Sequence, residues 1–236
     1  KYEWESLRNK QDNPVSIDHF IADKIRNGEL EPIASEIIKY AIYYLIKGTE
    51  QAFSEGDYSP ADSWIGELAK KLSTYDFETI KNNLTVVTFN YDRTFEKYFT
   101  ESLSQHMSLS LQIDDLQDNV LHVYDSLGNL KEIPFKLENE RYEIISRHFC
   151  KIMLIDERSE TTLEIPNVDK FKKIHFIGFG YDKTNMSLID LKRFASATFH
   201  GTAYYYTEEQ KAFLKTEYNI DAKDICCKDY IQNMVI

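Results

Sequence analysis

The chain has 236 residues and a formal net charge of −11, from 28 basic and 39 acidic residues. Hydrophobic residues make up 42% of it, with 8 Gly and 5 Pro, which is an ordinary globular composition and excludes a disordered or fibrous chain. The acidic balance without a basic stripe argues against a surface that binds a nucleic-acid backbone directly.

The first third of the chain is predicted to be helical. Apolar residues recur there at helical spacing in three segments, 17–25, 33–46 and 64–72. Ser16 and the pair Ser59-Pro60 are expected to start the first and third helices, because they provide N-caps and a proline at the first helical position. Gly28 and Gly48 are expected to end the first and second helices.

From Leu84 onwards the pattern changes to short, apolar, largely β-branched runs. Four runs that end in polar or glycine-containing turns are predicted to be strands: 84–89, 120–124, 173–177 and 202–206. Helices are predicted behind the first, third and fourth strands, the last with Thr207 as N-cap and Gln210 completing a capping box. The weaker pattern that follows Gly128 favours a hairpin, a helix near 140–148 and a strand at 151–155.

Strands that alternate with helices predict an α/β fold of the Rossmann-like, doubly wound type, with a mostly parallel sheet. We expect a single domain with a helical insertion at 16–83, a core at 84–217 and a C-terminal segment at 218–236. Ligands of such sheets bind outside the carboxyl ends of the strands. The turns expected to lie together at that edge are 88–92, 122–129 and 178–185.

Cysteine content and hydropathy indicate the compartment. The three cysteines, Cys150, Cys226 and Cys227, fit neither a disulfide framework nor a zinc site, because their number is odd and two are adjacent. No apolar run approaches the roughly 20 residues that span a bilayer, and no signal-peptide pattern is present. We therefore expect a cytoplasmic protein that binds neither a membrane nor a metal.

Polar side chains at the first two strand ends are candidates for chemistry. The amide of Asn90 offers both a donor and an acceptor, and the carboxylate of Asp92 accepts from a carboxamide N–H or a sugar hydroxyl. The alternative is that Asn90 shapes the turn and Asp92 caps the following helix. His122, on the same strand face as Tyr124, is a candidate general base, although a lone strand histidine is more often a core residue.

The third strand end is a weaker signal. Gly178-Phe179-Gly180 permits close approach of a ligand to the backbone, but it also fits a tight turn between strand and helix. Asn185 is a candidate to cap the next helix or to contact a sugar. The remaining histidines are expected to be structural: His19, His106, His148, His175 and His200.

In this order, the segments resemble the sirtuin-like NAD-hydrolase family of bacterial defence proteins. Residues 88–96 (TFNYDRTFE) resemble that family's strand-end motif, and residues 122–128 (HVYDSLG) resemble the element that carries its catalytic histidine. Residues 177–181, followed by Asn185, resemble the segment that cradles the adenosine side of the nucleotide. With residues 16–20 and 201–203, which also fit, the resemblance spans roughly 16 to 217.

The resemblance implies that NAD is a substrate, cleaved to nicotinamide and ADP-ribose without a metal. Asn90 would hold the ribose or the attacking water, Asp92 would bind the nicotinamide carboxamide, and His122 would accept a proton. The other expected NAD contacts are Thr88, Phe89, Tyr91, Tyr124, Ser126, Gly178, Phe179, Gly180, Tyr181 and Asn185. Members of the family deplete NAD in antiphage defence, so a homo-oligomer or a partner defence subunit is expected.

Three departures from the family pattern leave alternatives open. The family's first strand and Gly-rich loop are absent, and because the chain begins at Lys1 we expect them ahead of it. Asp125 replaces a glycine, and Tyr124 stands where sirtuins have a second histidine, so a catalytically impaired sensor of NAD or ADP-ribose is one alternative. A protein deacylase is disfavoured by the lack of zinc-binding cysteine pairs, and a nuclease by the acidic charge and the lack of an acidic metal cluster.

Overall fold

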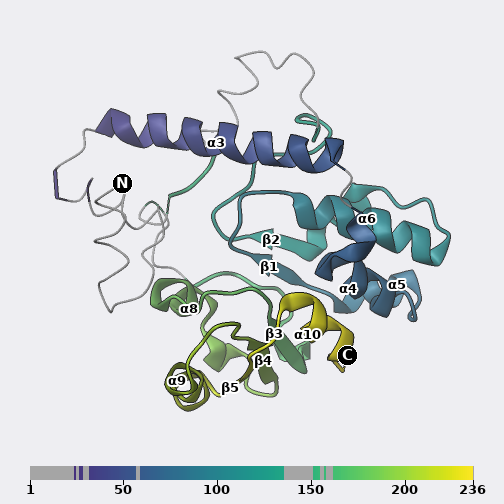
Figure 1. Cartoon of the computed structure of the whole chain (residues 1–236), viewed down its shortest axis with the longest axis vertical. Helices are drawn as coiled ribbons and strands as arrows, with labels where there is room; N and C mark the ends of the chain where they lie inside the picture. The colour runs from purple at the N-terminus through teal and green to yellow at the C-terminus, as the bar shows by residue number, and fades with distance from the viewer. Residues whose placement is uncertain are drawn as a thin grey trace. The chain divides into compact units, whose positions relative to one another are not determined.

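The computed structural model of the protein describes residues 24, 27–28, 32–56, 59–135, 151–154, 157 and 162–235. These residues form a mixed α/β structure with two small parallel sheets, of strand order β1-β2 and β3-β4-β5 (Figure 1). The strands are β1 (Val86–Thr88), β2 (Val120–His122), β3 (Lys173–Phe176), β4 (Thr198–Thr202) and β5 (Ile220–Lys223). The α-helices are α3 (Pro32–Glu55), α4 (Trp64–Leu72), α5 (Phe77–Asn83), α6 (Thr94–Met107), α8 (Lys183–Ile189), α9 (Glu208–Tyr218) and α10 (Cys227–Asn233).

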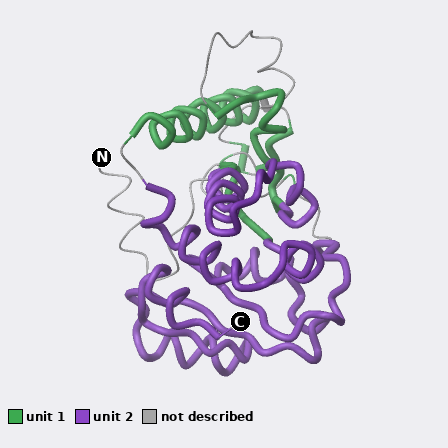
Figure 2. The backbone as a smooth tube through the Cα atoms, turned by 90° about the vertical axis from the view of Figure 1, so that its right-hand side faces the viewer, with its two compact units in different colours: residues 1–57, 87–93, 122–161 green, residues 58–86, 94–121, 162–236 purple. Residues whose placement is uncertain are grey.

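Internal contacts divide the chain into two compact units, each built from separated segments (Figure 2). Unit 1 comprises residues 1–57, 87–93 and 122–161, and unit 2 comprises residues 58–86, 94–121 and 162–236. The described part of unit 1 contains α3 and the segments that follow β1 and β2. None of the helices among the described residues is both long and apolar enough to cross a bilayer.

The second predicted helix is confirmed as α3, but it continues past Gly48 to Glu55, so the expected end at Gly48 is wrong. A glycine inside a helix costs about 1 kcal/mol relative to alanine. Tertiary contacts on both sides of Gly48 hold this part of the helix, because Lys47 donates to Phe135 O and Glu50 pairs with Arg93. Gly28 has the positive φ of +69° expected at a helix end, whereas most of the helix predicted before it lies outside the described residues.

Ser59 and Pro60 do start a helical turn, but it is the short 3-10 helix η1 (Pro60–Asp62) rather than the predicted long helix. Helix α4 has its own N-cap, Ser63, whose Oγ accepts a hydrogen bond from Gly66 N at 3.1 Å. Helix α5 was not predicted, although Asp76 caps it by accepting from Thr79 N at 2.8 Å. Both helices therefore begin at a local side-chain cap.

Helices α4, α6 and α10 pack together in unit 2. Trp64 of α4 contacts Phe95 of α6, with ring centroids 6.0 Å apart. Lys71 of α4 donates from Nζ to the carbonyls of Ile231 and Gln232 at 3.1 and 2.9 Å, and so caps the last turn of α10. The helix predicted behind the first strand is confirmed as α6.

The β3-β4-β5 sheet follows the order β3-α8-β4-α9-β5, which makes two parallel β-α-β units. The predicted third strand and the capping box of Thr207 and Gln210 are confirmed. The predicted strand at 202–206 is wrong: β4 lies four residues earlier, and Tyr205 has a φ of +65°, which a strand residue does not adopt. The C-terminal segment adds β5 and α10, which were not predicted.

Strands β1 and β2 are shorter than predicted, and each is followed by a turn in unit 1. The pairing continues one residue beyond the strands, because Val123 N donates to Thr88 O at 2.9 Å. Residues 151–154 are not a strand, contrary to the prediction for that segment, whereas the predicted helix at 140–148 lies outside the described residues. Met153 N nevertheless bonds Tyr124 O at 3.1 Å, so this segment lies beside the turn after β2.

Candidate functional site

The turns after β1 and β2 bring two of the predicted catalytic residues together in unit 1. His122 ends β2, and its Nδ1 lies 2.9 Å from the backbone oxygen of Asn90. The Asn90 residue is exposed, and His122 and Asp92 are half-buried. An imidazole, an amide and a carboxylate on two neighbouring turns form a set that can bind a polar ligand and accept a proton.

The contact between His122 and Asn90 fixes the tautomer of the histidine. A backbone carbonyl oxygen only accepts hydrogen bonds, so Nδ1 of His122 must carry the hydrogen and donate it. In the neutral ring the lone pair is then on Nε2, which is the nitrogen able to accept a proton. This is the form that a general base requires, and the backbone of the turn at residues 88–92 (the Asn90 turn) selects it.

Three aromatic residues pack around these turns. Tyr124 is buried, and its ring centroid lies 6.0 Å from that of Phe89 and 6.3 Å from that of Tyr91. The Tyr91 hydroxyl donates to Met153 O at 2.9 Å. Tyr91 and Tyr124 therefore form the packed support of the turns, and Phe89, which is only half-buried, is the aromatic residue of this group best placed to meet a ligand.

The hydroxyl groups of Thr88 and Ser126 shape the two turns. Asn90 N donates to Thr88 Oγ1 at 3.1 Å, and Gly128 N donates to Ser126 Oγ at 3.3 Å. Each hydroxyl thus accepts a hydrogen bond from a backbone N–H two residues ahead, which is a common turn motif. Helix α6 begins at Thr94, two residues beyond Asp92.

Asp125 has a φ of +63°, in the left-handed region that favours glycine. Aspartate tolerates the conformation better than most residues, because its short side chain bonds the local backbone. Here Asp125 Oδ1 accepts from Ser126 N at 2.7 Å.

If NAD binds with its diphosphate beside Asp125, as the sequence resemblance implies, replacing Asp125 with glycine would strengthen that binding about fivefold, because two like charges roughly 4 Å apart in water repel by about 1 kcal/mol. Asp125→Asn is the matched control, since asparagine also adopts positive φ but carries no charge. Titration calorimetry with NAD checks both variants. Equal affinity in all three proteins would show that the carboxylate does not face the diphosphate.

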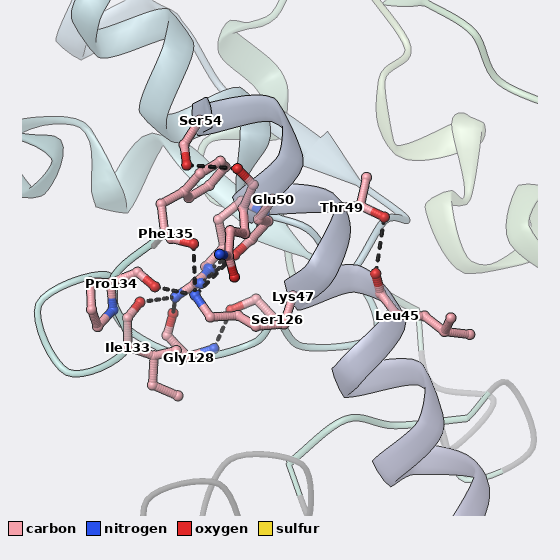
Figure 3. Close-up of polar contacts among 12 residues, drawn as sticks. Leu45, Lys47, Thr49, Glu50, Ser54, Ser126, Gly128, Ile133, Pro134 and Phe135 are labelled. Atoms are coloured by element: carbon pink, nitrogen blue, oxygen red, sulfur yellow. Dashed lines mark hydrogen bonds and ion pairs between the residues drawn. The ribbon is translucent and has the colours of Figure 1, made fainter. Parts of the chain in front are cut away.

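A buried ionic network joins α3 to both turns (Figure 3). Arg93 follows the Asn90 turn and is 2% exposed, whereas Lys47 and Glu50 of α3 are 0% exposed. Arg93 Nη2 lies 2.6 Å from Glu50 Oε2, and Arg93 Nη1 donates to Gly128 O and Ile133 O at 2.9 and 2.8 Å. Lys47 Nζ lies 3.7 Å from Glu50 Oε2.

The lysine of this network also bonds the chain that follows Gly128. Figure 3 shows Lys47 and Glu50 pointing from α3 toward the loop that carries Ile133, Pro134 and Phe135. Lys47 Nζ donates to Phe135 O at 3.1 Å and also to Pro134 O. The charges in this buried network are therefore compensated by hydrogen bonds as well as by one another.

The predicted Gly178 turn and Asn185 belong to unit 2. Gly178 has a φ of +61°, and its N–H donates to Thr202 Oγ1 at 2.9 Å. Tyr181 is buried and donates from its hydroxyl to Thr202 O at 2.9 Å, and burial raises the pKa of this hydroxyl. Its oxygen is thus engaged within the protein, whereas Gly178 and Gly180 are exposed and Phe179 and Asn185 are half-buried.

The structure shows which residue caps the N-terminus of α8, a question that the sequence did not decide. Asp182, not Asn185, is its N-cap, and Asp182 Oδ1 accepts from the backbone N–H of Thr184 and of Asn185. The alternative that Asn185 caps this helix is therefore wrong. The prediction that its side chain contacts a ligand stays a prediction.

One face of the β3-β4-β5 sheet carries a second polar cluster. His175 and His200 are register partners on β3 and β4, with their rings stacked at a centroid distance of 5.5 Å. His175 Nδ1 lies 2.8 Å from the Tyr230 hydroxyl of α10, and His200 Nδ1 lies 3.7 Å from Asp221 Oδ2. Burial, followed by the charges of His200 and Lys173, lowers the pKa of His175 to about 4.

His175→Asn is expected to reduce the acid sensitivity of the fold between pH 6.5 and 4. The neutral His175 is favoured in the folded protein, so the unfolded chain binds more protons in this window and stability falls as the pH drops. The resulting decrease in the free energy of unfolding is below about 3 kcal/mol, because the ring is partly solvated. Asparagine keeps an acceptor for Tyr230 but does not titrate. Urea unfolding at pH 7 and pH 4.5 measures the free energy of unfolding of the variant and of the wild-type protein. An identical pH dependence would refute the assignment.

Sequence reasoning missed Lys47, Glu50 and the pairing of His175 with His200. The two charged residues of α3 lie on the helical face of buried Tyr43, but charged residues on a helix are exposed by default, so their spacing alone does not reveal a buried network. The histidine pair was missed because β4 was placed four residues too late.

No three His, Cys, Asp or Glu side chains among the described residues gather in a way that could hold a metal ion. The candidate site in unit 1 thus consists of Asn90, Asp92 and His122, supported by Phe89, Tyr91 and Tyr124. Comparison of the chain with protein-family models, with curated proteins and with solved structures gives no match.

Proposed function

We propose that the chain hydrolyses NAD to nicotinamide and ADP-ribose, with His122 as general base and with Asn90 and Asp92 as ligand-binding residues. The observation that carries the proposal is the 2.9 Å contact between His122 Nδ1 and Asn90 O. It supports the proposal because it joins the two turns at the residues concerned and leaves the proton-accepting lone pair on Nε2. NAD as the substrate comes from the resemblance of 88–96 and 122–128 to sirtuin-like NAD hydrolases.

In this reaction the bond between ribose C1′ and the nicotinamide nitrogen breaks, and its electron pair leaves with nicotinamide. Positive charge develops at C1′ and the ring oxygen, as in other glycoside hydrolyses. Water adds to C1′ and gives a proton to His122 Nε2, which later releases it to solvent. The exposed amide of Asn90 orients the water or a ribose hydroxyl, and the Asp92 carboxylate accepts from the carboxamide N–H.

The proposal includes the fold and the biological role. The parallel pairing and the order β3-α8-β4-α9-β5 support a doubly wound, Rossmann-like sheet. As in the family that the sequence resembles, cleavage would serve antiphage defence in the cytoplasm by depleting NAD. Activation would then depend on a homo-oligomer or a partner defence subunit.

A second candidate function is a sensor that binds NAD or ADP-ribose without cleaving it. The observation that favours it is Asp125, which holds a carboxylate at a backbone position suited to glycine. The sensor and the active hydrolase differ in one measurable property: only the hydrolase releases nicotinamide.

The test is incubation of the purified protein with NAD, followed by chromatography of the products. Equal amounts of nicotinamide and ADP-ribose support hydrolysis. Heat stabilisation by NAD without nicotinamide release favours the sensor, and release of nicotinamide only with an acyl-lysine peptide favours a deacylase. If NAD is not cleaved and does not stabilise the protein against heat, all three functions are contradicted.

A further inference from the structure

We propose that Glu50 and Arg93 are positioning residues, which hold the Asn90 turn and the loop after β2 in the one arrangement that supports turnover, without touching the ligand. The inference rests on the proposed function for the reaction that it serves. Neither residue is among those expected to contact NAD, although Arg93 lies within the 88–96 motif, and both are buried. The argument comes from which backbone groups they bind.

Glu50 fixes the main chain of the first turn, not only a side chain. Its Oε1 accepts from the backbone N–H of Arg93 at 2.9 Å and from Arg93 Nε at 3.1 Å, while Oε2 accepts from Nη2 at 2.6 Å. An ion pair that served stability alone would need only the guanidinium. The backbone bond holds the peptide that links Arg93 to Asp92, so Glu50 sets where the turn ends.

Arg93 extends the same constraint to the loop after β2. Its Nη1 donates to Gly128 O at 2.9 Å and to Ile133 O at 2.8 Å. Both carbonyls belong to the chain that follows His122. A single side chain therefore connects the end of the Asn90 turn to the far end of the loop that begins at His122.

Four contacts join the two turns, in order along residues 88–93. Val123 N bonds Thr88 O at 2.9 Å, and Leu127 N bonds Tyr91 O at 3.3 Å. Between these lies the contact of His122 Nδ1 with Asn90 O, and beyond them lies the bond from Arg93 to Gly128 O. The Asn90–His122 contact is thus held on both sides, and the outer side depends on Glu50.

The anchor of this arrangement comes from a distant part of the chain. Glu50 lies on α3, 43 residues before Arg93. Its carboxylate is shared by two buried cations, since Lys47 Nζ is 3.7 Å from Oε2 and Arg93 Nη2 is 2.6 Å from it. Neutralising Glu50 therefore weakens the hold on Arg93 without changing any residue of the two turns.

The experiment compares Glu50→Gln and Arg93→Lys with the wild-type protein. Glutamine keeps the shape of Glu50 but carries no charge, and its NH2 group cannot accept a hydrogen bond from Arg93. Lysine at position 93 cannot make the forked contacts of arginine. Two readouts are used: amide hydrogen exchange at residues 90–92 and 125–128, and the kcat and KM for NAD. Glu101→Gln is the matched control, because Glu101 forms an exposed pair with Lys97 at 2.6 Å on α6.

We expect exchange at both turns to become roughly tenfold faster in Glu50→Gln and Arg93→Lys, because the opening of each turn costs less free energy. We expect kcat to fall roughly tenfold with a KM change below about threefold, since the groups that bind NAD remain but are misplaced. Glu50→Asp, which keeps the charge, should restore part of the kcat that Glu50→Gln loses. Glu101→Gln should change neither readout.

Unchanged exchange at both turns in a folded Glu50→Gln protein would overturn the inference, as would faster exchange with an unchanged kcat. If Arg93→Lys does not fold, the comparison of Glu50→Gln with Glu50→Asp still decides it. If the wild-type protein releases no nicotinamide, the proposed function fails. The exchange measurement alone then decides whether Glu50 and Arg93 hold the two turns.

Discussion

His122→Ala is expected to lower the rate of nicotinamide release from NAD by roughly 10²-fold or more, because it removes the proposed general base. The hydrogen bond from Nδ1 to Asn90 O leaves the lone pair on Nε2, so the wild-type ring is ready to accept a proton from water. Alanine supplies no acceptor at that position. Chromatography of nicotinamide over time gives kcat and KM for both proteins.

Asn90→Ala is expected to have a similar effect for a different reason. The contact with His122 uses the backbone oxygen of Asn90, which alanine retains, so the tautomer of His122 is unchanged. The variant therefore removes only the amide that is proposed to orient the ribose or the water, and a loss of roughly 10²-fold would measure that orientation.

Matched controls for these two variants are available on exposed helical surfaces. His106 at the end of α6 and Asn82 in α5 are exposed, so His106→Ala and Asn82→Ala repeat the same chemical changes away from the turns. Both controls should keep full activity. Full activity in Asn90→Ala and His122→Ala as well would remove the basis of the assignment.

The elements that the sequence predicted well are those whose signals are local. The capping box of Thr207 and Gln210 marks the start of α9 correctly, because a cap is formed by residues three apart. Strand β4 was misplaced because the aromatic residues from Tyr204 onward have high β-propensity, whereas pairing with β3 selects Thr198–Thr202. Register between strands depends on partners that a single segment does not reveal.

The same distinction applies to the candidate site. The proximity of Asn90 and His122 could be predicted, because Asn90 follows β1 and His122 ends β2, and the carboxyl ends of these parallel strands meet at one edge. Glu50 could not, because a charged residue on a helix is exposed by default unless a partner elsewhere in the chain is buried with it. That partner, Arg93, is known only from the tertiary structure.

Arg93→Met is expected to lower the free energy of unfolding by about 3–5 kcal/mol, the usual cost of removing one partner of a buried ion pair. Methionine fills similar space but donates no hydrogen bond, so Glu50 loses its guanidinium, and the carbonyls of Gly128 and Ile133 lose their donor. Lys47, at 3.7 Å from the carboxylate, compensates only part of this loss. Urea unfolding followed by far-UV circular dichroism measures the change.

Two further variants separate the ion pair from the packing around it. Lys97→Met, in the exposed pair with Glu101, should change the free energy of unfolding by less than about 1 kcal/mol. Arg93→Met combined with Glu50→Leu and Lys47→Met should recover part of the stability lost in Arg93→Met, because it leaves no charge of the buried network without its partner. A loss below about 1 kcal/mol in Arg93→Met would mean that the buried pair is not formed as described. Stability could recover while the Asn90 turn stays unprotected from exchange, because apolar side chains stabilise the unit but accept no hydrogen bond from the backbone N–H of residue 93. That result would separate the role of Glu50 in stability from its role in holding the turn.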